Sequence, residues 1–176
     1  MRLSSGVPAT LPENVRERLE AHYRRRGFRR TPQRETIVAA AFSSEEHFTA
    51  DELWERARSI DPRTSRATVY RTISFLLDAD LIREIDLSQG QAVYDPNFVE
   101  KPNHNHLVCV DCGRMIEFED SHLEVFHECL TRRLGFLPSR QNLRIEACCE
   151  TLRTTGRCAH LIEARIKGKR LPGRRR

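Results

Sequence analysis

The chain has 176 residues, enough for one domain with a sizeable core or for two small domains. Hydrophobic residues make up 39% and charged residues 31%, and no apolar run approaches the roughly 18 residues of a membrane span. Because no apolar signal region opens the chain, we expect a cytoplasmic protein without a membrane partner.

The net charge of +5 is unevenly distributed along the chain. Residues 165–176 carry seven positive charges and no acid, so the net charge without them is −2. Further basic residues cluster at 24–26 and 29–30, where phosphate contact and an ordinary solvated helix face are both consistent with the pattern. We expect residues 163–176 to be a disordered basic tail that binds phosphates nonspecifically.

The first half of the chain predicts short helices after a flexible arm at residues 1–12. Residues 13–26 carry one apolar stripe, Val15, Leu19 and Tyr23, and Gly27 ends that helix. Thr31-Pro32 opens the next helix, and Thr49 with Glu52 forms a capping box that opens a third.

A fourth helix begins at Ser65, and two strands at 81–85 and 91–94 follow it as a hairpin. Helices followed by a two-stranded hairpin are typical of a winged-helix domain, here residues 13–95. In such a domain the last helix before the hairpin enters the major groove of DNA.

Residues 96–103 are rich in Pro and Asn and predict a linker to a second domain at 104–162. That domain should hold strands at 106–109, 114–118 and 143–148. Between the last two strands we expect a helix that opens with a capping box of Ser121 and Glu124 and ends at Gly135. Three strands and one helix leave a flat face open, so this α/β domain should pair with itself. The fold class is α+β.

Two metal half-sites lie within nine residues of each other. His104 and His106 alternate along a strand and therefore project from the same face. Cys109-x-x-Cys112-Gly has the spacing with which two thiolates grip a tetrahedral zinc ion from a tight turn. Since six cysteines in a reducing compartment favour metal binding over disulfides, we read the cluster as metal ligands.

The whole pattern resembles the ferric uptake regulator (Fur) superfamily over roughly residues 14–150. Four features carry the resemblance in chain order: the turn Gly27-Phe28-Arg29-Arg30-Thr31-Pro32-Gln33-Arg34, the helix segment Ala67-Thr68-Val69-Tyr70-Arg71, the run His-x-His-Leu-Val-Cys-x-x-Cys-Gly with Ile116-Glu117-Phe118, and a later strand cysteine. The resemblance implies a homodimeric, metal-responsive repressor of transcription that binds AT-rich inverted-repeat operators in double-stranded DNA.

By this resemblance, a structural zinc ion takes Cys109 and Cys112 with a second pair, Cys149 and Cys158. The spacing from Cys149 to Cys158 is longer than in the family, and a free thiol at Cys158 is the alternative. Cys148 and Cys149 are adjacent on a strand, so we expect only one of them to be a ligand. Cys129 should be a buried apolar residue within its helix.

The resemblance also implies a regulatory site formed by His47, Asp95, His104, His106 and Glu117. Mixed imidazole and carboxylate donors suit Fe(II), which we put first, and equally Mn(II) or Zn(II). Peroxide-sensing relatives carry Asp where this chain has Glu117, but they share the residue type of Asp95, so the class of sensor stays open.

A third metal site of many members aligns here with Asn103, Asn105, Glu124 and Gln141. Three of the four are amides, which are poor transition-metal ligands, and we predict that this site is absent. A substitute site that uses His122 or His127 near Glu124 is an alternative that we rank lower.

Five residues are expected to contact DNA. Tyr70 would pack on thymine methyl groups, Arg66 and Arg71 would reach phosphates or guanine edges, with Thr68 on the same helix. Arg29 matches a basic residue that relatives place in an AT-rich minor groove. For Tyr70 the alternative is packing in the core.

Two other classes of function compete with a DNA-binding regulator. The His, Asp and Glu residues would suit a metal-dependent enzyme with an open coordination position, although no phosphate loop or nucleophile motif accompanies them. A zinc-stabilised interaction module without DNA binding is the third reading. We favour the regulator, which has no catalytic residue and no small-molecule substrate.

Overall fold

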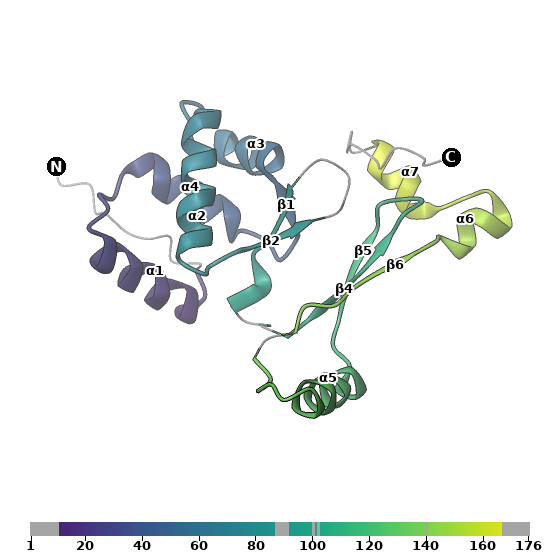
Figure 1. The fold of residues 1–176 in the computed structure, drawn as a ribbon. Coiled ribbons are helices and arrows are strands. Elements are labelled where there is room, and N and C mark those ends of the chain that lie inside the picture. Colours follow the sequence, from purple (N-terminus) through teal and green to yellow (C-terminus); the bar gives the residue numbers. More distant parts are fainter. Residues whose placement is uncertain (1–10, 87–91, 100, 102, 140, 167–176) are drawn as a thin grey trace. The chain divides into compact units, whose positions relative to one another are not determined.

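The structure is a computed structural model that describes residues 11–86, 92–99, 101, 103–139 and 141–166 (Figure 1). The chain divides into two compact units between residues 102 and 103. The predicted domain limits at 95 and 104 stay predictions beside this division. Residues 1–10 of the predicted arm and residues 167–176 of the predicted tail lie outside the described residues. Residues 163–166 were expected to be disordered, but they belong to a helix at Ala159–Ile166.

The first unit opens with helices whose ends follow from local sequence. Gly27 ends the first helix in the left-handed conformation (φ 63°). Thr31, Thr49 and Ser65 each cap a helix by accepting a backbone N–H, and the capping box of Thr49 with Glu52 is present as predicted. The elements are α1 (Glu13–Arg26), α2 (Pro32–Ala41), β1 (Phe48–Thr49), α3 (Ala50–Ile60) and α4 (Arg66–Asp78).

A small antiparallel sheet completes this unit in the order β1-β3-β2. β2 (Arg83–Asp86) and β3 (Ala92–Asp95) pair as the predicted hairpin, whose tip at 87–91 lies outside the described residues. A short 3-10 turn, η1 (Asn97–Val99), follows β3. The strand β1 was not predicted, because a strand of two residues leaves no periodic pattern.

Helices α2, α3 and α4 pack against one another over a single core. The largest buried side chains of this core come from α1, α2, β1, α3 and α4: Leu19, Ile37, Phe48, Leu53 and Leu76. Three helices followed by a two-stranded wing make this unit a winged-helix fold, in which α4 precedes the wing.

The second unit is a three-stranded sheet in the order β5-β4-β6, formed by β4 (Asn105–Cys109), β5 (Met115–Phe118) and β6 (Arg144–Ala147). β6 runs parallel to β4, so both strands end at the same edge of the sheet. Figure 1 shows α5 (Ser121–Arg133) at one end of the sheet, with α6 (Glu150–Thr155) and α7 (Ala159–Ile166) at the other. Neither α6 nor α7 was predicted.

Two expectations about α5 are wrong. The cap is Asp120, whose carboxylate accepts from the N–H groups of His122 and Leu123, so Ser121 and Glu124 do not form a capping box. Asp120, one residue before Ser121, takes the N-cap position because Asp is at least as good an N-cap as Ser. Cys129 is exposed rather than buried. The apolar stripe of a helix does not show whether other residues of the same chain cover that face.

Over the described ranges, no helix combines the length and apolar character that crossing a membrane requires.

Candidate DNA-binding surface and metal centres

Helix α4 presents two side chains to solvent from a well-anchored backbone. Val69 and Ile73 are buried, which turns the opposite face of the helix outward. On that face Tyr70 is 54% exposed and Arg71 is exposed, so the alternative that Tyr70 packs in the core is wrong. An aromatic ring beside a guanidinium suits contact with thymine methyl groups and with phosphates or guanine edges.

The other polar residues of α4 hold one another in place. Thr68 Oγ1 lies 2.9 Å from Ser65 Oγ and accepts a hydrogen bond from the Arg71 guanidinium at 3.3 Å. The Arg66 guanidinium pairs with Asp51 and lies 4.1 Å from the ring centroid of Trp54. Arg71 is therefore oriented by its own helix, whereas Arg66 is already engaged with α3.

Arg29 lies exposed on the turn before α2. Its carbonyl oxygen accepts a hydrogen bond from the Arg34 guanidinium at 2.8 Å, and Arg34 lies over the rings of Phe28 and Phe75. The backbone of the turn is thus fixed while the Arg29 side chain extends into solvent. This arrangement suits a side chain that reaches into a groove.

The first unit brings together a histidine and a carboxylate. His47 Nε2 lies 3.8 Å from Asp95 Oδ1, and Asp95 at the end of β3 is fully buried. The Asn97 backbone N–H donates to Asp95 Oδ1 at 2.7 Å, and its side-chain amide donates to the Glu45 carbonyl at 2.8 Å. Asn97 therefore links the loop that carries His47 to the turn that carries Asp95.

The second unit brings together two histidines on or next to β4 and a glutamate on β5. His104 and His106 are both buried, and their Nε2 atoms are 3.0 Å apart. Two nitrogens bound about 2.1 Å from one ion at a right angle stand about 3.0 Å apart, so this spacing fits adjacent ligands of a metal. Glu117 pairs with His106 across β4 and β5, which places both residues on the same face of the sheet.

Four cysteines converge at the opposite end of the same sheet. The Sγ atoms of Cys109, Cys112 and Cys149 lie within 4.8 Å of one another. Cys158 is buried in the same cluster. Four sulfurs about 2.3 Å from one zinc ion stand about 3.8 Å apart, which is compatible with the limit of 4.8 Å for these three Sγ atoms.

All six cysteines are free thiols, and the two outside the cluster, Cys129 and Cys148, are exposed. Burial raises the pKa of the Cys112 thiol to about 12, while a hydrogen bond from the Leu161 backbone lowers the pKa of Cys158. Three buried cysteines and the partly buried Cys149 form the sulfur donor set that soft and borderline metals prefer. Because a metal here would take thiolates as its ligands, its binding would release protons.

With these sites in view, comparison with known families is decisive. The model of the ferric uptake regulator family matches residues 25–146, more than half of the chain. The chain belongs to the ferric uptake regulator family. It is therefore a metal-responsive regulator with a winged-helix N-terminal domain, and its relatives are transcription regulators rather than enzymes.

Relatives within the family have different effectors. A ferric uptake regulation protein of Rhizobium leguminosarum bv. viciae is 34% identical over 123 residues, which cover 70% of this chain and 85% of the relative. The peroxide-responsive repressor PerR of Staphylococcus aureus is 28% identical over 141 residues, covering 78% and 93%. A ferric uptake regulator structure from Pseudomonas aeruginosa with manganese is 27% identical, with a TM-score of 0.65 and coverage of 74% and 97%.

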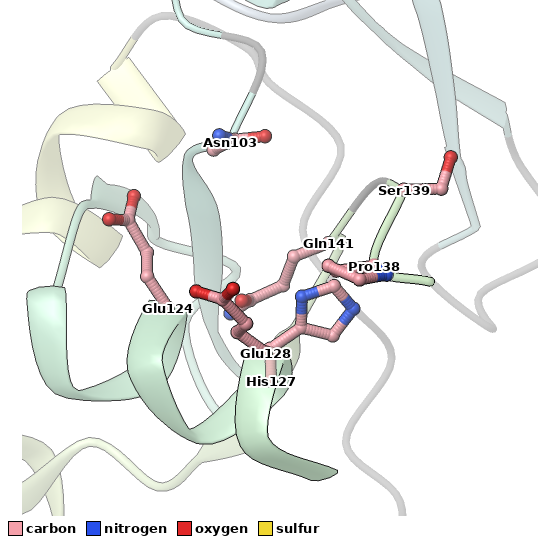
Figure 2. Close-up of a pocket in the computed structure, with 7 residues that line it drawn as sticks. All are labelled: Asn103, Glu124, His127, Glu128, Pro138, Ser139 and Gln141. Atoms are coloured by element: carbon pink, nitrogen blue, oxygen red, sulfur yellow. The ribbon is translucent and has the colours of Figure 1, made fainter. Parts of the chain in front are cut away.

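A separate pocket of about 300 Å³ lies in the second unit, and its lining includes three of the four residues that the sequence analysis assigned to an absent third metal site (Figure 2). Its lining consists of Asn103, Glu124, His127, Glu128, Pro138, Ser139 and Gln141. The Gln141 amide donates to Asn105 Oδ1 at 3.2 Å, so two of the amides bond to each other. The prediction that this family member binds no metal there stays a prediction.

Sequence reasoning missed three residues that support the predicted ligands. Asn97 braces the His47 and Asp95 pair, and Asp111 contacts Arg153 next to the cysteine cluster. Asp111 and Arg153 are 42 positions apart in the sequence, so no local sequence pattern predicts their contact. The position of Asp111 between Cys109 and Cys112 was the one local signal that could have singled it out.

Proposed function

We propose that this protein is a homodimeric repressor that binds AT-rich, inverted-repeat operators in double-stranded DNA when a regulatory Fe(II) ion is bound. The observation that carries the proposal is the buried pair of His104 and His106, with Nε2 atoms 3.0 Å apart. Burying two polar imidazole rings together gains little free energy from the hydrophobic effect, whereas one cation bound by both rings accounts for their placement. The exposed Tyr70 and Arg71 of the same chain supply the DNA-reading surface.

The structural ion of this proposal is zinc, held by Cys109, Cys112, Cys149 and Cys158. Support comes from the clustering of four sulfurs and from their burial against Leu152 and Leu161. The first pair lies at the end of β4 and the second pair flanks α6, so one ion would join the sheet to the C-terminal helices. Zinc supplies folding free energy at such closed, all-protein sites.

The regulatory ion of this proposal takes His47, Asp95, His104, His106 and Glu117 as its ligands. In support, each unit holds only part of a coordination shell: one histidine and one carboxylate in the first, two histidines and one carboxylate in the second. Imidazole and carboxylate donors are compatible with Fe(II), Mn(II) and Zn(II), so manganese and zinc remain alternatives, as does peroxide sensing through a bound Fe(II) ion.

Ligands drawn from both units would make metal binding and domain arrangement one equilibrium. His47 and Asp95 belong to the DNA-binding unit, whereas His104 and His106 belong to the unit proposed to dimerise. Without the ion this tie would be lost, and the spacing of the two α4 helices of the dimer would no longer be fixed. Metal then favours DNA binding to the extent that it binds the competent arrangement more tightly.

A second copy of the chain is the partner proposed for the second unit. The structure describes every α5 side chain, and none of them is buried. Even the apolar side chains of Val125 and Phe126 are 61% and 63% exposed. Leu134, Phe136 and Leu137, which follow the helix, are 63%, 70% and 82% exposed. Several large apolar side chains left exposed on one segment support an interface, and a symmetric dimer would match the two halves of an inverted repeat.

Counting bound metal tests this function directly. Native mass spectrometry of the protein loaded with zinc and then with Mn(II) should find one ion of each per chain. His104→Ala/His106→Ala should lose the manganese and keep the zinc, and Cys112→Ser should lose the zinc. A double-histidine variant that still binds manganese like the parent would contradict the regulatory site.

A further inference from the structure

We propose that Asp111 is the positioning residue of the cysteine centre, and that it acts together with Arg153 to hold the second pair of thiolates against the first. Asp111 lies in the turn between Cys109 and Cys112, and its carboxylate reaches the start of α6. This inference rests on the proposed zinc site and assigns a role to two residues outside its ligand set.

The turn that carries Asp111 is rigid before its carboxylate makes any contact. The Gly113 N–H donates to the Cys109 carbonyl at 2.9 Å, and Gly113 has a φ of 72°, where only glycine is free of strain. The Val110 N–H donates to the Ala147 carbonyl at 2.9 Å, which continues the β4 and β6 pairing into the turn. Asp111 therefore projects from a fixed backbone.

The Asp111 carboxylate makes three hydrogen bonds to the segment that carries Cys149. Oδ2 accepts from the Cys149 backbone N–H at 2.8 Å and from Arg153 Nε at 2.9 Å, and Oδ1 accepts from a terminal Arg153 nitrogen at 3.1 Å. Cys149 caps α6 and Arg153 lies one turn later, so the carboxylate spans the first turn of the helix. The pairing with Arg153 is bidentate, the geometry that fixes direction best.

Charge gives the same pair a second effect on the centre. Four thiolates around one zinc ion leave a net charge of −2, and Asp111 adds another negative charge beside them. The Arg153 guanidinium interacts electrostatically with Cys109 and Cys148, so it offsets negative charge where thiolates gather. Asp111 thus orients both a ligand backbone and the cation that balances the ligand charge, as residues that hydrogen bond to metal ligands do elsewhere.

Zinc affinity, measured by competition with a chromophoric chelator on the full chain, tests the proposal. Asp111→Ala should weaken zinc binding about 10- to 100-fold. Asp111→Asn retains an oxygen for the Cys149 N–H but loses the charge, and Arg153→Gln loses the cation, so both should give smaller losses. Glu150→Gln on the same helix is the matched control and should bind zinc like the parent.

A spectroscopic measurement separates positioning of the ligands from simple loss of stability. In the Co(II)-loaded protein, Asp111→Ala should shift or weaken the thiolate-to-metal absorption bands, and Glu150→Gln should leave them unchanged. The inference is overturned if Asp111→Ala binds zinc within twofold of the parent while Cys112→Ala has lost it. A parent protein that takes up no zinc would instead overturn the proposed zinc site itself.

Discussion

Tyr70 and Arg71 show how single positions separate binding from folding. Both side chains face solvent from α4, while the neighbouring Val69 and Ile73 are buried in the core. Arg71 is oriented by Thr68 on its own helix rather than by a distant partner. Changes at these two exposed positions should therefore affect DNA binding and leave stability nearly unchanged.

Tyr70→Ala and Arg71→Ala should each weaken operator binding by about 1–3 kcal/mol, roughly 5- to 150-fold, because each removes a contact to base edges or phosphates. Fluorescence anisotropy at fixed salt measures the change. Ser74→Ala, which is exposed on the same helix, is the control and should bind like the parent. Unchanged operator affinity in both α4 variants would show that Tyr70 and Arg71 do not form the DNA-reading surface.

A substitution at Asn97 should affect the regulatory metal site and leave the zinc site unchanged. Its side-chain amide holds the Glu45 carbonyl, two residues before His47, so Asn97→Ala should loosen that loop. We expect about tenfold weaker Mn(II) binding by isothermal titration calorimetry, with zinc content unchanged. The exposed Asn142→Ala is the control. Equal manganese affinity in parent and Asn97→Ala would show that this brace does not matter to the site.

At the scale of elements, local sequence predicts helix ends better than it predicts partners. Thr31, Thr49 and Ser65 cap their helices as expected because a cap depends on residues only three positions apart. The helices α6 and α7 were missed because their packing depends on the cysteine cluster rather than on a periodic stripe. The same limit explains Cys129, whose stripe on α5 is apolar but not covered by its own chain.

The candidate sites divide along the same line. The spacing of His104, His106, Cys109 and Cys112 places those residues together without any knowledge of the fold, since each pair is local. Cys149 and Cys158 joined the predicted set only through the family resemblance, and the structure brings them to the first pair through the parallel pairing of β4 and β6. The contacts of Asp111 and Asn97 depend on distant backbone and were beyond a local pattern.

The cap of α5 offers a direct test at this scale. Asp120→Ala removes the acceptor for the N–H groups of His122 and Leu123 and should lower the free energy of unfolding by about 1 kcal/mol. Ser121→Ala should change it far less, since Ser121 is not the cap. Urea unfolding of the zinc-loaded protein measures both. A larger loss for Ser121→Ala would restore the capping box that the sequence predicted.

A buried histidine couples α1 and α4 to pH. His22 Nε2 lies 3.4 Å from Asp78, its Nδ1 lies 3.2 Å from the Arg25 guanidinium, and Arg26 also pairs with Asp78. Burial lowers the pKa of His22 below its ordinary value of 6.5, with nearby Arg25 and Arg26 acting in the same direction and Asp78 opposing them. The unfolded state therefore binds the proton more readily than the folded state.

Because the folded-state pKa is depressed, the contribution of His22 to stability is fully present above pH 6.5 and is lost as pH falls toward the folded-state pKa. His22→Gln should make the free energy of unfolding fall less between neutral and acidic pH than it does in the parent. Urea titrations across this range measure the difference. An unchanged pH dependence of stability in His22→Gln would contradict this role of His22.

At the scale of the whole molecule, the proposed regulatory metal ion links the two units. The first unit has its own apolar core, and the second has the cysteine cluster. The first unit carries the exposed α4 surface, and the second carries the cysteine centre and the apolar α5 surface. Zinc would hold the sheet of the second unit to its C-terminal helices, and the regulatory ion would set when the pair of α4 helices in the dimer matches an operator. Different ligands in one chain thus allow one constant ion and one sensed ion.

Operator binding titrated with metal tests this claim most directly. Zinc-loaded protein on an AT-rich, inverted-repeat probe should bind only as Fe(II), or Mn(II) in its place, is added under anaerobic conditions at fixed salt. His104→Ala/His106→Ala should not respond to either metal, and His122→Ala/His127→Ala should respond like the parent. Binding that is indifferent both to added metal and to the loss of His104 and His106 would contradict the account.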